Sequence, residues 1–243
     1  MQTWGLSDPG SVREQNQDTF VIQELSEVSI LAVVCDGMGG ARSGDVASRL
    51  AMEKFSEEVL LRWQEDLSEE RVYEILRSGV ALANAAVYEK ANSGEEYSGM
   101  GTTLVAAVVS QREAYIINVG DSRAYHVNNS GIAQVTTDHS FVQMMVHCGE
   151  LTPEEAKNHP RKNLITRAIG TETKVEGDVY RVELEETDCL ALCSDGLSNV
   201  LADQEILFEI VHGETRDDCC QRLLKIAKTR GAPDNVTVVV VSP

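Results

Sequence analysis

Five short apolar segments constrain the fold of this chain more than any other feature. Each is rich in Val, Ile or Leu and is bounded by Gly, Asp or Asn, which is typical of a buried β-strand. A further strand is expected in "TFVIQ", directly after Asp18. The five segments span residues 29–36, 101–110, 113–121, 188–195 and 235–241.

Helical patterns separate these strands. Apolar residues recur at helical spacing across residues 44–63 and 69–92, between the first two strands, and again across 216–229. Two helices in succession do not fit a strict alternation of strand and helix. We therefore predict an α/β layered sandwich (α-β-β-α), in which two mainly antiparallel sheets are flanked by paired helices. The length of 243 residues suits one domain, residues 1–243.

Two segments carry more local signals. In "EAYIINVGDSRAYHV", Gly120 and Asp121 lie between two apolar runs, and this pattern predicts an antiparallel hairpin. The stretch from about 138 to 175 is polar and contains "TPEE", in which Thr152 is suited to cap a helix and Glu155 to bond back to it. We expect a small helical insert there, which is either a mobile flap over a site or a passive surface excursion.

The charge and cysteine content exclude several partners. Thirty-nine acidic and 21 basic residues give a formal net charge of −18, and such a surface repels nucleic acid and anionic membranes. The six cysteines include no C-x-x-C pair, which argues against zinc. No segment is apolar enough to span a membrane, and the first residues lack a secretory pattern. We expect a cytoplasmic protein with reduced thiols and with neither nucleic acid nor a membrane as partner.

Aspartates stand at the ends of the apolar segments. One such residue is ordinary turn chemistry, but the strand ends of a sandwich meet at a common edge, where several carboxylates repel one another unless they are protonated or neutralised. A hard divalent cation neutralises them, and oxygen ligands without a His or Cys cluster favour Mg²⁺ or Mn²⁺ over zinc. At Gly37 a backbone carbonyl could approach the ion without an intervening side chain. The aspartates are Asp18, Asp36, Asp121, Asp195 and Asp234.

Carboxylates that hold two metal ions suit phosphoryl chemistry. An arginine is then needed to grip the phosphate with two hydrogen bonds, and Arg13, five residues before Asp18, is the best placed candidate. Taken alone, Arg13 is more simply an ordinary surface arginine. Other phosphatase and hydrolase chemistries lack their residues, since the chain has no Cys-x₅-Arg, no D-x-D after a strand and no G-x-S-x-G.

Eight segments together resemble the bacterial metal-dependent protein serine/threonine phosphatases, the PPM or type 2C family. They run in order over essentially the whole chain: "SVREQNQD", "VVCDGMGG", "SGMGTTLV", "NVGDSRAY", "TTDHS", "RAIG", "LCSDGLSN" and "DNVTVVVV". The resemblance implies hydrolysis of phosphoserine or phosphothreonine in proteins by a hydroxide that bridges two metal ions, without a covalent intermediate. It also implies a fold of two β-sheets flanked by paired helices, and a flap at 138–175 that gates the substrate.

The resemblance assigns metal ligands by position. Asp36 would bridge two core Mn²⁺ or Mg²⁺ ions, and the Gly37 carbonyl would help to hold one of them. Asp195 and Asp234 would complete the shell of the other ion. Asp18 would act near the ion at Gly37, directly or through water. A third, weaker ion matches the positions of Asp121 and Asp195.

Three further positions matter for the chemistry. Arg13 matches the family arginine that binds the substrate phosphate. Gln17 stands where many relatives have Glu, and it supplies no charge to the metal shell. Met38 stands where eukaryotic relatives have a His that is thought to protonate the leaving group, and bacterial members commonly lack that His too. The sequence therefore assigns no general acid.

The implied partners are phosphorylated proteins, as made by a bacterial serine/threonine kinase, and a monomer is expected. Two alternatives stay open. One is a catalytically inactive binding or regulatory module, which is disfavoured because Asp18, Asp36, Asp195 and Asp234 are all present. The other is a phosphatase of a small phosphorylated metabolite, whose site would have the same chemistry.

Overall fold

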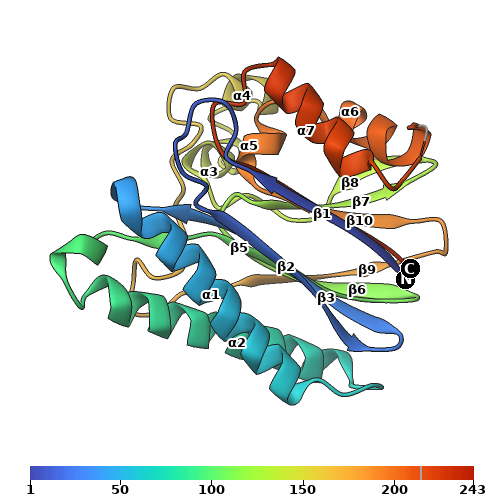
Figure 1. The fold of residues 1–243 in the computed structure, drawn as a ribbon, viewed down its shortest axis with the longest axis horizontal. Coiled ribbons are helices and arrows are strands. Elements are labelled where there is room, and N and C mark those ends of the chain that lie inside the picture. Colours follow the sequence, from blue (N-terminus) through green and yellow to red (C-terminus); the bar gives the residue numbers. More distant parts are fainter. Residues whose placement is uncertain (214) are drawn as a thin grey trace.

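Two β-sheets pack face to face, and helices cover both outer faces (Figure 1). The computed structural model describes residues 1–213 and 215–243, with the side chains of residues 40–42 left out. Every strand pairing it contains is antiparallel. The layered α-β-β-α sandwich predicted from the sequence is confirmed.

The two sheets draw their strands from different parts of the chain. The first sheet has the order β1-β11-β10-β7-β8, and the second has β2-β3-β5-β6-β9 with β4 beside β3. The first comprises β1 Gln2–Asp8, β7 Arg123–Asn128, β8 Gly131–Gln134, β10 Cys189–Cys193 and β11 Val236–Ser242. The second comprises β2 Asp18–Ser26, β3 Ser29–Met38, β4 Gly101–Thr102, β5 Leu104–Ser110, β6 Glu113–Val119 and β9 Asp178–Glu183.

Paired long helices cover the second sheet, and shorter helices cover the first (Figure 1). On the second sheet lie α1 Gly40–Arg62 and α2 Glu69–Ala91, followed by the 3₁₀ turn η1 Glu95–Tyr97. Over the first lie α5 Asp195–Ser198, α6 Asp203–Leu207, the π-helical turn η2 Phe208–His212 and α7 Cys219–Thr229. The insert holds α3 Phe141–His147 and α4 Pro153–Lys157. The capping box at Thr152 and Glu155 is present as predicted.

The sequences of the central strands are continuous apolar runs because both faces of each sheet are covered. Along β3, Leu31, Val33 and Cys35 pack toward α1 and α2, whereas Ala32 and Val34 pack between the sheets. All five side chains are fully buried. The alternation that a half-exposed strand would show is therefore absent from the sequence.

The predicted hairpin across Gly120 and Asp121 is wrong. β6 pairs with β5 and β9, whereas β7 pairs with β10 and β8, so the chain crosses from one sheet to the other at this point. Gly120 has φ +111°, and a Cβ there would lie 2.6 Å from the Thr103 side chain. The tight crossing thus requires glycine, and it leaves Asp121 where the two sheets end together.

No helix in the described part of the chain has the length and apolarity needed to cross a membrane. All six cysteines are free, as the sequence predicted, and only Cys148 among them is exposed.

Candidate active site

The strand ends that were expected to meet do share one edge of the sandwich. Asp18 begins β2 and stands opposite Asp36 of β3 in the antiparallel ladder. Asp195 begins α5, two residues after the end of β10, and Asp234 lies two residues before β11. Burial raises the pKa of Asp36 well above its usual value, and the charges of Asp18, Asp195, Asp121 and Asp234 raise it further. The structure therefore brings the other four predicted aspartates within electrostatic reach of Asp36.

Only one of the two carboxylate oxygens of Asp18 accepts hydrogen bonds. Its Oδ2 accepts hydrogen bonds from Ser194 Oγ and Thr237 Oγ1, both at 2.7 Å. Its Oδ1 is buried and has no partner. Burial raises the pKa of Asp18 to about 6, although the two hydroxyl groups act in the opposite direction. A buried carboxylate oxygen without a donor is costly, so this atom is the clearest sign that the described residues lack a positive neighbour there.

Asp36 is fixed through its backbone. Its N–H donates to Thr103 Oγ1 at 2.9 Å, and its carbonyl oxygen accepts from the Thr103 N–H at 2.9 Å and from Thr102 Oγ1 at 2.8 Å. These bonds hold the end of β3 against the β4–β5 segment. The Asp36 side chain therefore remains available for bonding inside the cluster.

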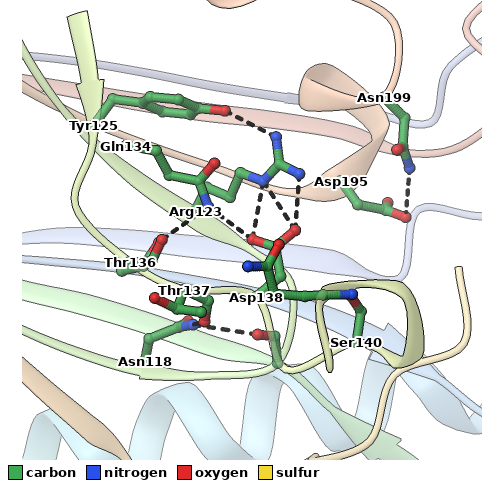
Figure 2. A network of polar contacts seen from close by, with 12 residues as sticks. Asn118, Arg123, Tyr125, Gln134, Thr136, Thr137, Asp138, Ser140, Asp195 and Asn199 are labelled. Atoms are coloured by element: carbon green, nitrogen blue, oxygen red, sulfur yellow. Dashed lines mark hydrogen bonds and ion pairs between the residues drawn. The ribbon is translucent and has the colours of Figure 1, made fainter. Parts of the chain in front are cut away.

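Asp195 and Asp121 line a cleft together with residues of the insert, and Figure 2 shows the Asp195 side chain beside Asn199. Asn199 Nδ2 donates to Asp195 Oδ2 at 3.0 Å. Burial raises the pKa of Asp195, and the charge of Asp234 adds to this effect. Burial, followed by the charges of Asp195 and Asp138, raises the pKa of Asp121 to about 8. Both carboxylates thus lack sufficient positive charge around them.

Arg13 stands at the rim of the cluster. Its Nη2 donates to Asp234 Oδ2 at 2.8 Å, and 56% of its side chain is exposed. The remaining donors of its guanidinium group are free to meet a ligand in solvent, since no other bond of Arg13 occurs among the described residues. The arginine predicted to bind phosphate is therefore beside the carboxylates, facing outward.

The backbone at Gly37 admits no side chain. A Cβ at this position would lie 2.1 Å from the Gly44 carbonyl oxygen in α1 and 2.7 Å from that of Gln17. The Gly37 N–H donates to the Gln17 carbonyl at 3.1 Å. Glycine here allows the start of α1 to lie against the end of β3, as close approach to an ion would also require.

The residues present fit a divalent cation. The donor set consists of oxygens, one of which is buried without a partner, and mutual repulsion raises the pKa of Asp36 beyond the effect of burial. Hard cations such as Mg²⁺ and Mn²⁺ prefer this set. Within the described residues, no group of three or more His, Cys, Asp or Glu side chains stands in coordinating geometry.

A cleft of about 670 Å³ opens beside this cluster, between the insert and the α5–α6 segment. Asp121 and Asp195 line it, and so do Lys157 and Lys162 of the insert. Its lining also includes apolar side chains, among them Val142. The insert therefore faces the carboxylate cluster rather than lying elsewhere on the surface.

Sequence reasoning missed the residues that hold the aspartates. Ser194, Thr237 and Thr103 lie in or beside apolar strands, where their hydroxyl groups resemble those of ordinary core residues. The only available signal was position, because Ser194 directly precedes Asp195. His139 was also missed, although it lies in the quoted segment "TTDHS".

Comparison with known proteins identifies relatives of this chain. The family model described as protein phosphatase 2C matches residues 11–230. The serine/threonine phosphatase Stp of Listeria monocytogenes is 38% identical over 97% of this chain and 93% of its own length. The protein phosphatase PhpP of Streptococcus pneumoniae is 34% identical over 98% of this chain and 95% of its own length.

Solved structures show the same fold. The serine/threonine phosphatase Stp1 of Staphylococcus aureus superposes with a TM-score of 0.92 at 36% identity, covering 100% of this chain and 94% of that one. The catalytic domain of the phosphatase PstP, solved in complex with two manganese ions, gives a TM-score of 0.84 at 32% identity and covers 99% and 97% of the two chains. The chain therefore belongs to the protein phosphatase 2C family, a family of serine/threonine protein phosphatases.

Proposed function

We propose that this protein is an active, divalent-metal-dependent phosphatase that hydrolyses phosphoserine and phosphothreonine in proteins. The observation that carries the proposal is the carboxylate cluster beside an outward-facing arginine. Asp18 keeps a buried oxygen without a donor, Asp36 is surrounded by other carboxylates, and Arg13 stands at the rim. An inactive binding module would have no need of carboxylates held at this cost.

Two core ions, Mn²⁺ or Mg²⁺, would be held by Asp36 in common, by Asp18 and the Gly37 carbonyl, and by Asp195 and Asp234. Asp121 and Asp195 would hold a third, weaker ion. When bound, such ions lower the pKa of the attacking water and neutralise charge on the phosphoryl oxygens. Hydrolysis would then take place in one step, without a covalent intermediate.

The residues of this chain bind and orient the substrate. Arg13 would present its free guanidinium N–H groups to two phosphate oxygens while its bond to Asp234 sets the plane of the group. The cleft between the insert and α5–α6 would receive the polypeptide on either side of the phosphorylated residue. Met38 cannot donate a proton, so protonation of the leaving group is not assigned to the position where eukaryotic relatives have His.

The setting proposed for this activity is the cytoplasm, where free thiols persist, with proteins phosphorylated by a bacterial serine/threonine kinase as substrates. We propose that the protein acts as a monomer. A small phosphorylated metabolite is the second candidate substrate, but the cleft of about 670 Å³ extends well beyond the carboxylates and favours a longer chain.

The decisive experiment is hydrolysis of a phosphothreonine peptide by metal-stripped protein, with Mn²⁺ or Mg²⁺ added back. Asp36→Asn and Asp195→Asn should abolish the metal-dependent activity. Asp188→Asn is the matched control, because Asp188 is a buried aspartate at the opposite end of β10. Activity that survives in both site variants would refute the proposed metal ligands. An inactive wild type that still binds Mn²⁺ would favour the binding module or the metabolite.

A further inference from the structure

His139 holds both backbone groups of Gly120, the residue before Asp121. The Gly120 N–H donates to His139 Nδ1 at 3.0 Å, and the Gly120 carbonyl oxygen accepts from the His139 N–H at 2.9 Å. Asn118 Nδ2 donates to the same carbonyl at 3.2 Å. At φ +111° the backbone of Gly120 is in a region that few residues adopt, so these bonds define the conformation of the crossing between the two sheets.

The tautomer of His139 follows from these contacts. Because Nδ1 accepts a hydrogen bond, the proton of the neutral ring lies on Nε2. Nε2 then donates to Asp178 Oδ2 at 3.0 Å, and Asp178 Oδ1 accepts from Arg167 Nη1 at 2.8 Å. Only 7% of the His139 side chain is exposed, and burial lowers its pKa. A chain of polar contacts thus runs from Arg167 through the imidazole to the Gly120 N–H.

The neighbouring residue holds the other side of Asp121. Asp138 accepts hydrogen bonds from Arg123 Nε at 3.0 Å and from Arg123 Nη2 at 2.7 Å, while Gln134 Nε2 donates to Asp138 Oδ1 at 2.9 Å (Figure 2). Arg123 lies two residues after Asp121. Asp138 and His139 are consecutive in sequence, and their hydrogen bonds therefore fix the chain on both sides of Asp121.

The same residues anchor both ends of the insert. His139 and Ser140 lead into α3, and the returning chain bonds to them, with the Thr166 N–H donating to the His139 carbonyl at 2.8 Å. Ser140 and Ile165 form an isolated antiparallel bridge. His139 therefore helps to fix both the insert and the backbone next to Asp121.

We infer that His139 is a positioning residue that orients the Asp121 carboxylate, through Gly120, toward a divalent ion bound in the cleft that Asp121 lines. The inference rests on the proposed function, because it assumes that Asp121 contacts an ion. Outer residues of this kind change metal affinity by about 10- to 100-fold when they are lost.

Two substitutions separate the two ring contacts. His139→Asn keeps an acceptor where Nδ1 lies and loses the reach to Asp178. His139→Gln keeps a donor near Nε2 and loses the acceptor for Gly120. The matched control is His126→Gln, because His126 Nε2 makes the same kind of contact with Asp188, at 2.7 Å, on the far end of β7.

The first measurement is amide hydrogen exchange of Gly120 in the metal-free protein. We expect slow exchange in the wild type, His139→Asn and His126→Gln, and at least about tenfold faster exchange in His139→Gln. The second is a calorimetric Mn²⁺ titration, in which Asp121→Asn identifies the binding step that needs this carboxylate. His139→Gln should weaken that step about tenfold or more, and His139→Asn should stay within about threefold of the wild type.

Equal Mn²⁺ affinity in His139→Gln and the wild type, or equal losses in both His139 variants, would overturn the inference. A titration that Asp121→Asn leaves unchanged would also overturn it. If His139→Gln does not fold, Asp178→Ala tests the same chain of contacts. It removes the acceptor that keeps the ring proton on Nε2, and a ring that carries its proton on Nδ1 cannot accept from the Gly120 N–H, a change that Asn at position 139 cannot undergo. Faster exchange of Gly120 with weaker Mn²⁺ binding is therefore expected, and unchanged values would contradict us. A wild type that binds no Mn²⁺ would refute the proposed function instead. The hydrogen-exchange measurement requires no metal and would still test the contact between His139 and Gly120.

Discussion

We expect the buried charge of Asp18 to make the metal-free protein less stable at neutral pH than in mild acid. Burial is the main cause that raises the pKa of Asp18 from 3.8 to about 6, so the folded state holds this proton over a pH range in which the unfolded chain has lost it. The contribution of Asp18 to the free energy of unfolding should therefore fall as the pH rises from about 4 to about 6, and it should stay lower above that range.

The size of this effect follows from the pKa. A rise from 3.8 to about 6 corresponds to about 3 kcal/mol of destabilisation once the carboxylate is ionised. Asp18→Asn removes the charge, and its amide oxygen can still accept from Ser194 and Thr237. In chelator at pH 7.5 we expect the variant to be more stable than the wild type by about 1–3 kcal/mol, with the difference disappearing near pH 4.

Urea unfolding in EDTA at pH 4 and pH 7.5 measures this difference directly, provided that the dependence on urea is the same for both proteins. Saturating Mn²⁺ should reverse the order, because the carboxylate then binds an ion that Asn holds less well. An Asp18→Asn variant that is no more stable than the wild type at pH 7.5 in EDTA would show that the buried charge is not costly, and the argument for a cation at Oδ1 would fail.

Three further substitutions test separate parts of the structure. Arg13→Ala should lower kcat/KM for a phosphothreonine peptide by about 10²-fold and change the free energy of unfolding by less than about 0.5 kcal/mol, since its bond to Asp234 is exposed; comparable losses of stability would contradict its role at the phosphate. Gly37→Ala should cost about 3 kcal/mol or more in urea unfolding, because its Cβ would lie 2.1 Å from the Gly44 carbonyl oxygen, and a variant of normal stability would mean that α1 can shift away. Phe55→Ala should cost about 3–5 kcal/mol because the ring is fully buried between α1 and α2, while kcat at 25 °C is retained in the folded fraction; a large fall in kcat would show that this layer shapes the site.

The buried strands were predictable because they are covered on both sides. β3, β5, β10 and β11 are almost entirely buried, so the apolar runs mark them without knowledge of their partners. The strands that the sequence did not single out are only partly covered. β9, for example, has intermediate or exposed residues along its whole length, as expected of a sheet edge.

The strands with which β6 and β7 pair were not predictable from the local sequence pattern. Gly120 and Asp121 signal that the chain changes direction, but the same signal serves a hairpin and a crossing between sheets. The choice between a hairpin and a crossing is decided by the pairing of β6 with β9 and of β7 with β10, and the two strands of each pair are distant in sequence. The site aspartates were predictable because charge beside a buried strand is expensive, whereas the hydroxyl groups that hold Asp18 carry no such signature.

The candidate site lies along the seam between the two sheets, and this position explains how so many carboxylates are held in place. Asp18 belongs to the second sheet, yet both hydroxyl groups on its Oδ2 come from the first, Ser194 after β10 and Thr237 in β11. Asp121 stands where the chain crosses from one sheet to the other, and Arg13 lies in the β1–β2 connection that does the same. Because each of these groups depends on both sheets, a change in how the sheets pack must move the carboxylates relative to one another and to the arginine.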